Sequence, residues 1–321
     1  MFQFMDYVYA VYQEKSFTAA AKNLFISQPA LSASIKKLEG QLGVTLFDRT
    51  ASPVRLTPAG EAYIEAVQEV YRIRRELEEK LNDISKLKTG HLVVSGANFI
   101  SSFVLPEILM AFAGEYPGIQ VQMVESNSPS LTEQLLSEEI DLLIDYHPDE
   151  KLCVSYPLLS EEILLCVPSG WAVNEQLGHF ALSAGEIQRR QGPKRPGVQL
   201  QMFSQQKFLL LKPGNDMNRR ALQLCKNSGF VPEASLYLDQ LMTSYNLAKA
   251  GLGIAFVTDT LVHNIEDSGT CLFYRLAQEN ARRTLFLAHK RNRYLTLAAR
   301  AFIGTALRVY GGRAAQDGAV I

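Results

Sequence analysis

Residues 16–50, SFTAAAKNLFISQPALSASIKKLEGQLGVTLFDRT, predict the fold of the N-terminal part of this chain. Its central part predicts a helix that begins after Ser27, because serine is a favourable N-cap. Pro29 falls in the first turn, where its missing N–H costs nothing, and Gly43 ends the helix.

Two shorter helices are predicted before this one. Residues 4–14 repeat apolar side chains at helical spacing, and Thr18 is placed to cap a helix over residues 19–24. The resulting order of helix, short helix, tight turn and longer helix is typical of a helix-turn-helix unit.

The helix after Ser27 has two different faces. The face predicted to be buried consists of Leu31, Ile35, Leu38 and Leu42. The opposite row consists of Gln28, Ser32 and Lys36. Glutamine can pair with an adenine edge, and serine or lysine can contact bases or phosphates in a major groove. An ordinary solvated helix face has the same composition, so this row alone leaves both interpretations open.

A short β-hairpin, or wing, is predicted next. Residues 51–53 form a turn and residues 54–56 alternate as a short strand. Arg49 and Arg55 lie on the flanks of the hairpin, where they can hold DNA phosphates. We therefore expect a mainly α-helical winged helix-turn-helix domain over residues 1–57.

Residues 58–90 form a linker in which residues 58–88 predict one long helix. Apolar residues recur every seven positions, at Tyr63, Val70, Leu77 and Ile84. The companion row contains Val67, Arg74, Leu81 and Lys88, so the coiled-coil seam is imperfect. We expect this helix to pair two protomers; a helix packed only on its own domain is the alternative.

Residues 91–310 alternate apolar runs with amphipathic stretches, which is typical of an α/β domain with a parallel sheet. Strands are predicted at residues 91–96, 119–125, 141–145, 163–167, 208–211, 236–239, 254–257 and 285–289. Helices are predicted at residues 102–116, 131–139, 217–228, 241–250 and 297–310. We expect two α/β lobes, with crossovers near residues 160–206 and 265–280, and a flexible tail over residues 311–321.

A small-molecule site is predicted between the lobes, because ligands of open α/β sheets bind at the C-terminal ends of strands. The candidate residues are Asn98, Phe99, Ser101, Ser102, Ser128, Tyr146, His147, Asn215 and Arg219. Hydroxyls and helix N-terminal amides at these positions suit a carboxylate, His147 or Arg219 adds charge, and Phe99 or Tyr146 can stack. We therefore expect the ligand to be a small organic anion.

The segment over residues 183–206 is longer than a simple crossover. It carries Arg189, Arg190, Lys194 and Arg195 together with two prolines and three glycines. A solvated, mobile loop is expected here. Contact with a neighbouring protomer or with DNA is the alternative.

Composition excludes several classes of protein. The 321 residues carry a formal net charge of −1, so any contact with nucleic acid must rest on a local surface. The four cysteines, Cys153, Cys166, Cys225 and Cys271, are too few for a disulfide scaffold and show no compact pairing. We expect buried thiols, no membrane span and a reducing, cytoplasmic setting.

Enzyme motifs are also absent from the sequence. CxxC, HExxH, GxGxxG and GxSxG patterns do not occur, and the five histidines lack metal-ligand spacing. We therefore expect a protein that is not an enzyme and needs neither a metal nor a cofactor.

The SQPALS, LE-x-x-LG-x-x-LF-x-R and LT-x-AGE elements of residues 27–61 resemble the winged helix-turn-helix of LysR-type transcriptional regulators. By position, the resemblance implies DNA contacts from Gln28, Pro29 and Ser32, next to Ser27. Ala33 stands where the family often has arginine, and Ser52-Pro53 where a basic residue is common. The base preference and phosphate contacts of this chain can therefore differ from those of the family, with Lys36 as the nearest compensation.

The stretches YPGIQVQMVESNSPSL (116–131), EIDLLI (139–144) and LAKAGLGIAF (247–256) resemble the effector domain of the same family, which is similar to type II periplasmic binding proteins. The resemblance implies double-stranded operator DNA with an interrupted palindrome, a small effector in the cleft, and dimers or tetramers. It also implies RNA polymerase as a partner if the protein activates transcription. A cytoplasmic bilobal small-molecule-binding protein without active DNA binding is the alternative.

Overall fold

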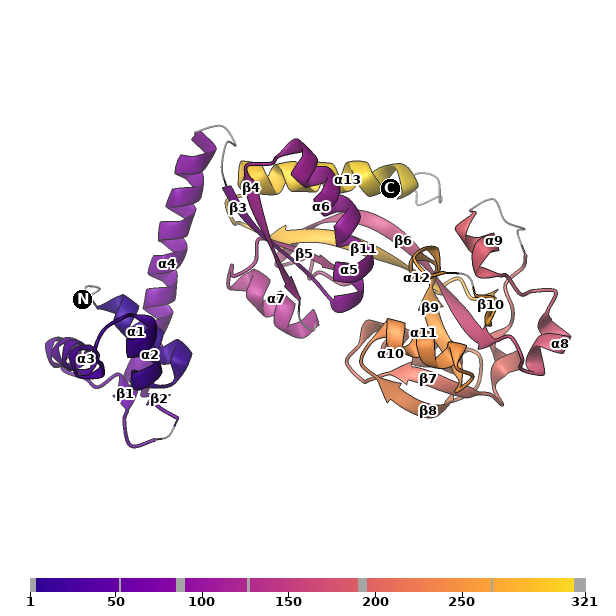
Figure 1. Ribbon diagram of the computed structural model, residues 1–321, viewed down its shortest axis with the longest axis horizontal. Helices are drawn as coiled ribbons and strands as arrows, with labels where there is room; N and C mark the ends of the chain where they lie inside the picture. Colours follow the sequence, from indigo (N-terminus) through magenta and orange to yellow (C-terminus); the bar gives the residue numbers. More distant parts are fainter. Residues whose placement is uncertain are drawn as a thin grey trace. The chain divides into compact units, whose positions relative to one another are not determined.

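The computed structural model describes residues 4–51, 53–84, 90–125, 128–189, 195–266 and 268–314 (Figure 1). Within these ranges, the side chains of residues 76, 79, 82–84, 128, 129 and 312–314 lie outside the description. The chain divides into two compact units, one ending at Ile84 and one following it.

The first unit is a helix-turn-helix with a wing. Its helices are α1 (Met5–Glu14), α2 (Phe17–Asn23), α3 (Gln28–Leu42) and α4 (Pro58–Ile84). Strands β1 (Phe47–Asp48) and β2 (Arg55–Leu56) pair antiparallel to form the wing. The core lies between the helices and contains the predicted residues Leu31, Ile35 and Leu38.

The ends of α3 match the sequence prediction. The Ser27 Oγ accepts a hydrogen bond of 3.3 Å from the Ala30 N–H, and Gly43 follows in the left-handed conformation, with φ of 72°. The predicted cap of α2 is wrong. Ser16, not Thr18, caps this helix by accepting a hydrogen bond of 3.3 Å from the Ala19 N–H. The helix begins at Phe17, whose ring packs against that of Phe47 in the core.

The beginning of α4 packs on its own unit. Tyr63, Ile64 and Val67 are buried, and a Cβ at Gly60 would lie only 2.0 Å from the Leu46 carbonyl oxygen. Glycine is therefore required for this close approach. The predicted seam residues Leu77 and Leu81, together with Ile73, are exposed further along the helix. The end of the predicted helix, residues 85–88, lies outside the described residues.

Among the described residues, the first lobe of the second unit contains three parallel strands and four helices. The strands are β3 (Gly90–Gly96), β4 (Ile119–Glu125) and β5 (Leu142–Asp145), with β3 in the middle. The helices are α5 (Asn98–Phe103), α6 (Leu105–Glu115), α7 (Ser128–Leu136) and α13 (Leu297–Ala314). Two separate cores cover the sheet, one formed with α5, α6 and α13 and the other with α7. The single helix predicted over residues 102–116 is wrong, because the chain forms two helices that meet at Val104.

The second lobe has one large core. Its strands are β7 (Lys207–Leu211), β8 (Glu233–Leu238), β9 (Ile254–Thr258) and β10 (Cys271–Arg275). Its helices are α8 (Val173–Leu177), α9 (Ala184–Gln188), the 3-10 helix η1 (Leu200–Phe203), α10 (Asp216–Asn227), α11 (Leu241–Lys249) and α12 (Asp259–His263). Strand β7 lies parallel to both β8 and β9. Helices α8, α9 and α12 and strand β10 were not predicted from the sequence.

Two long antiparallel strands connect the lobes, β6 (Cys153–Pro168) and β11 (Arg282–Lys290) (Figure 1). The predicted crossovers near residues 160–206 and 265–280 are therefore too long and displaced. Residues beyond β6 belong to the core of the second lobe, as buried Leu182, Phe203 and Phe273 show. The strand continues through two glutamates because Arg283 of β11 stands directly opposite Glu161 in the register.

The expectation of a solvated loop over residues 183–206 is wrong for its described part. A capping box between Ser183 and Glu186 starts α9. Arg195 is paired with Glu186 at 3.1 Å, while Leu200 and Phe203 are fully buried. Buried apolar residues therefore fix this segment on the second lobe. Arg190, Pro193 and Lys194 lie outside the described residues.

Candidate DNA-binding surface and effector cavity

The outward face of α3 carries most of the candidate DNA contacts. Ser27, Gln28, Pro29, Ala33 and Lys36 are exposed, and Ser32 is half-buried. Gln28 is the first residue of α3, directly after the cap. An exposed glutamine at the start of the second helix of a helix-turn-helix is a candidate for contact with a base edge.

Arg49 connects the wing to α3. Its guanidinium donates to the Ser32 Oγ at 2.9 Å and to the Glu39 carboxylate at 3.0 Å, and it lies 4.8 Å from the centre of the Phe17 ring. Glu39 is buried and also accepts the Leu46 N–H at 2.8 Å. Arg49 is therefore held in place, with its side chain 31% exposed toward solvent.

The role of Glu39 was not predicted from the sequence, where this residue is only part of a motif. The available signal was a single acidic residue beside the buried face of a helix, which indicates a buried partner. The remaining wing candidate, Arg55, is exposed and faces Asp48 across the β1–β2 pair. Ser52 lies outside the described residues.

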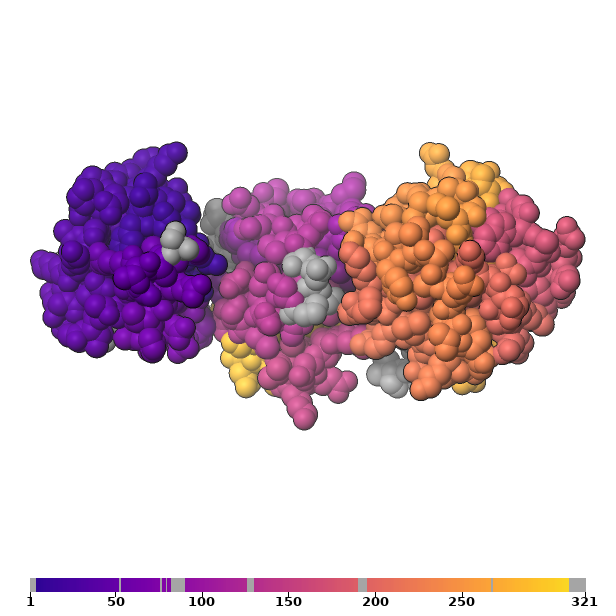
Figure 2. Space-filling view, turned by 90° about the horizontal axis from the view of Figure 1, so that it is seen from below, coloured from indigo at the N-terminus to yellow at the C-terminus, as the bar shows by residue number. Residues whose placement is uncertain are grey.

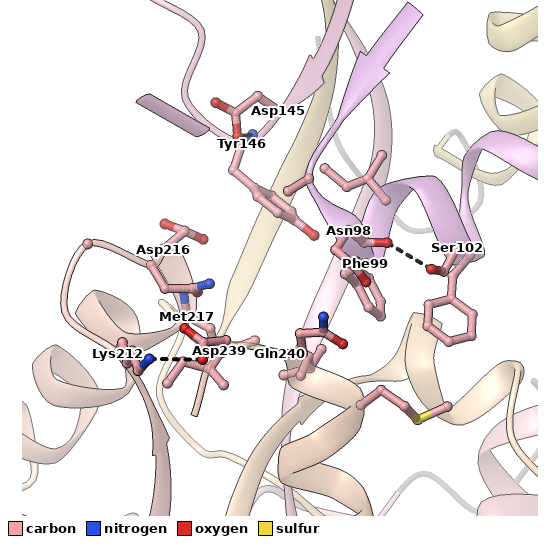
Figure 3. Close-up of a pocket in the computed structure, with 18 of the residues that line it drawn as sticks. Asn98, Phe99, Ser102, Asp145, Tyr146, Lys212, Asp216, Met217, Asp239 and Gln240 are labelled. Atoms are coloured by element: carbon pink, nitrogen blue, oxygen red, sulfur yellow. Dashed lines mark hydrogen bonds and ion pairs between the residues drawn. The ribbon is translucent and has the colours of Figure 1, made fainter. Parts of the chain in front are cut away.

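A cavity of about 530 Å³ lies between the two lobes of the second unit. Figure 3 shows Asn98, Phe99 and Ser102 from the first lobe facing Met217 and Gln240 from the second. The space-filling view shows the magenta surface of the first lobe meeting the orange surface of the second (Figure 2). The volume and mixed lining are typical of a pocket for a small organic molecule.

The structure brings five of the nine predicted ligand-binding residues to this cavity. They are Asn98, Phe99, Ser102, Tyr146 and Asn215. Three others do not line it: Ser101 is buried with its hydroxyl donating to the Gly96 carbonyl, and His147 and Arg219 are exposed beside Asp216. The side chain of Ser128, and Ser126 and Asn127 before it, lie outside the described residues.

A buried charged group forms one wall of the cavity. Arg283 is 4% exposed by its side chain and donates to Glu161 at 2.8 Å and to Asp216 at 3.1 Å. The Tyr146 hydroxyl donates to the same Glu161 carboxylate at 2.8 Å, and the guanidinium lies 3.7 Å from the centre of the Tyr146 ring. Burial raises the pKa of Tyr146 well above its ordinary value. Tyr146 therefore stays a hydrogen-bond donor at neutral pH.

Asp216 of the second lobe links the buried Arg283 group to a residue of the first lobe. The His147 ring of the first lobe lies 3.0 Å from the Asp216 carboxylate of the second, and Arg220 donates to the same carboxylate at 3.0 Å. Burial raises the pKa of Asp216, but the attraction of Arg283 and Arg220 outweighs burial and holds it below its ordinary value. Asp216 is therefore ionised, and it attracts cations from the second lobe and from the crossing strands.

Two other carboxyl groups of this region, those of Asp259 and Asp145, have raised pKa values. Burial, and then the nearby Glu161 charge, raise the pKa of Asp259 to about 7. Burial also raises the pKa of Asp145, which lines the cavity. The Glu161 Oε1 is buried and has no hydrogen-bond partner among the described residues.

Several cavity residues were missed by the sequence analysis: Asp145, Lys212, Asp216, Asp239, Gln240, Met242 and Arg283. Asp216 lies between the predicted residues Asn215 and Arg219 but was not itself predicted. Arg283 carried no local signal, because only the register of β11 against β6 places it opposite Glu161.

The four cysteines are free and buried. The expectation that they form no compact pair is wrong for Cys166 and Cys271. Strand β10 lies beside β6 and brings these thiols into a hydrogen bond that lowers the pKa of Cys271, while burial raises that of Cys166. Within the described ranges, no cluster of His, Cys, Asp or Glu is placed to hold a metal. None of the described helices is both long and apolar enough to cross a membrane.

Family models match both units. Residues 2–61 match the bacterial regulatory helix-turn-helix protein, LysR family, and residues 85–311 match the LysR substrate binding domain. The chain belongs to the LysR family of transcriptional regulators, with a helix-turn-helix DNA-binding domain followed by an effector-binding domain.

The chain is 35% identical over 309 residues to the uncharacterized HTH-type transcriptional regulator YcgK of Bacillus subtilis, covering 93% of this chain and 91% of the relative. It is 25% identical over 302 residues to the DNA-binding transcriptional dual regulator OxyR of Escherichia coli, covering 92% of each.

Two solved structures share the fold. Full-length CbnR complexed with its target DNA has a TM-score of 0.66 at 20% identity and covers 96% of this chain and 99% of its own. A full-length OxyR variant from Pseudomonas aeruginosa has a TM-score of 0.68 at 22% identity and covers 95% of this chain and 93% of its own.

Proposed function

We propose that α3 reads the major groove of an operator through Gln28, Pro29 and Ser32, with Lys36 and Arg55 on nearby phosphates. The observation that carries this proposal is the exposure of Gln28 at the capped start of α3. Arg49 holds Ser32 and the wing together, so it has a positioning role besides any phosphate contact.

Gln28→Ala is expected to weaken operator binding by roughly 1–3 kcal/mol and to relax the preference at one base pair, because a bidentate contact to a base edge is lost. Purified protein would be used to capture genomic DNA, and the enriched fragments would be titrated with wild type and variant.

Gln41→Ala is the matched control, since it removes an exposed glutamine at the other end of α3. An equal loss of affinity for all sequences would show that Gln28 only positions the helix. If wild type retained no DNA even at low salt, a bilobal binding protein without active DNA binding would be the better description.

We further propose that the protein acts as a dimer or tetramer on an interrupted palindrome. The support is the exposed apolar row Ile73, Leu77 and Leu81 on α4, which is continuous with the buried part of the same helix. Two recognition helices read two half-sites, which multiplies selectivity. RNA polymerase is a further partner where the bound protein activates a promoter.

We propose that the effector is a small organic anion that binds in the cavity between the lobes. Both cations of the described lining are already paired, Lys212 with Asp239 at 2.9 Å and Arg283 with Asp216. An acid group entering the cavity therefore replaces Asp216 at Arg283. The exchange frees Asp216 from its place beside His147 and shifts the population of lobe arrangements.

Asp216→Asn is expected to tighten anion binding by about tenfold, because the acid group no longer displaces a carboxylate. Thermal-shift titrations would compare an aryl carboxylate with the amine of the same carbon skeleton. Stabilisation by the amine and not by the carboxylate would contradict the anion proposal while leaving the DNA-binding proposal intact.

A further inference from the structure

Phe25 is a large apolar side chain almost completely outside the fold. It is 96% exposed, more than any other large hydrophobic residue among those described. It lies in the turn between α2 and α3. The Phe25 N–H donates to the Lys22 carbonyl and the Ile26 N–H donates to the Ala21 carbonyl, but these backbone hydrogen bonds leave the Phe25 ring exposed. A phenylalanine in water gives up most of the free energy that its burial would contribute.

The backbone at Phe25 is also unfavourable for this residue type. Its φ is 54°, in the left-handed region, where asparagine or glycine is tolerated far better than a bulky side chain. Strain of this kind persists where the surrounding structure fixes it, and it clusters at functional sites. Phe25 is therefore unfavourable for stability in two ways, through its exposed ring and through its left-handed backbone, and its ring adds nothing to the core of the unit.

The position of Phe25 places it beside the DNA-reading surface. It precedes the cap Ser27 by two residues and Gln28 by three, at the end of α3 that we propose enters a major groove. Lys22, three residues before Phe25 in the last turn of α2, is also exposed. An apolar ring next to a cation suits a DNA strand, which offers deoxyribose and thymine methyl groups between its phosphates.

We infer that Phe25 is a DNA-contacting residue whose ring packs against a sugar or a thymine methyl next to the base pair read by Gln28. This inference rests on the proposed operator binding and adds a contact from the turn to those from α3. The left-handed conformation at residue 25 points the ring outward, so the contact is made without rearrangement of the turn.

The test uses the operator fragment captured by the wild-type chain. Phe25→Asn removes the ring and keeps the left-handed backbone at lower cost, so we expect affinity to fall about fivefold to tenfold while the melting temperature stays equal or rises. Phe25→Tyr, which keeps the ring, should retain most of the affinity.

Val44→Asn is the matched control, since Val44 is another exposed apolar residue beyond the opposite end of α3. This change should leave operator affinity unaltered. Unchanged affinity of Phe25→Asn, or a loss of stability that accounts for its weaker binding, would overturn the inference. Failure of the wild-type chain to enrich any sequence would instead overturn the operator proposal, and the Phe25 contact with it.

Discussion

Arg283→Met is expected to lower the free energy of unfolding of the second unit by about 3–5 kcal/mol, the largest stability effect that we expect for a single substitution in this chain. The change leaves Glu161, which is fully buried, without its cation while the Tyr146 hydroxyl still points at it. A buried carboxylate that loses its partner bears the full cost of desolvation. Denaturant unfolding of the full chain measures the effect.

Arg219→Met provides the matched control, because it removes another arginine that contacts Asp216. The Arg219 side chain is 65% exposed, so its loss should change stability by less than about 0.5 kcal/mol. Adding Glu161→Gln to Arg283→Met should recover part of the stability by removing the stranded charge. Equal effects of the two arginine substitutions would show that burial of the Arg283–Glu161 pair does not matter.

Leu77→Glu combined with Leu81→Glu should convert the assembled protein toward smaller species and reduce operator affinity by roughly 100-fold or more. Both side chains are 57% exposed in the single chain and lie one helical turn apart on α4. In a dimer paired through α4, the new carboxylates would be buried against a second helix, which is unfavourable. The dimer would therefore dissociate, and two DNA-binding units would no longer bind the operator together. Sedimentation velocity and operator titration measure the two effects.

Gln68→Glu is the control, since it adds an acid to an exposed position on the same helix without touching the apolar row. This variant should assemble and bind as wild type does. Assembly of the double variant at wild-type concentrations would place the main contact between protomers in the effector-binding unit instead of α4.

The helix-turn-helix was predictable because its signals are local. Ser27 caps α3 and Gly43 ends it, while Leu31, Ile35 and Leu38 repeat at the spacing of one helix face. These residues interact within one or two helical turns, so their spacing in the sequence is enough to predict the helix. The cap of α2 was misplaced by two residues because Phe17 is drawn into the helix by its contact with Phe47, which is distant in sequence.

The connection between the lobes was not predictable in the same way. Glu161 and Glu162 interrupt an apolar run, so the sequence pattern predicted a strand that begins after them. In the structure, β6 includes both glutamates and begins at Cys153. Arg283 faces Glu161 from β11, and Arg275 pairs with Glu162 at 3.1 Å. A charged residue fits a buried strand only when an opposite charge lies across from it, and that partner is more than a hundred residues away.

Local sequence patterns were enough to predict helices α1, α2 and α3 and the wing of the first unit, and the α/β character of the second. Each of these follows from periodicity and capping among near neighbours. The side chains that form the cavity, and those held in its wall, could be identified only from the three-dimensional fold. Asp216, Arg283 and Glu161 meet there because two long strands pair in one register, and a register between distant segments leaves no trace in local spacing.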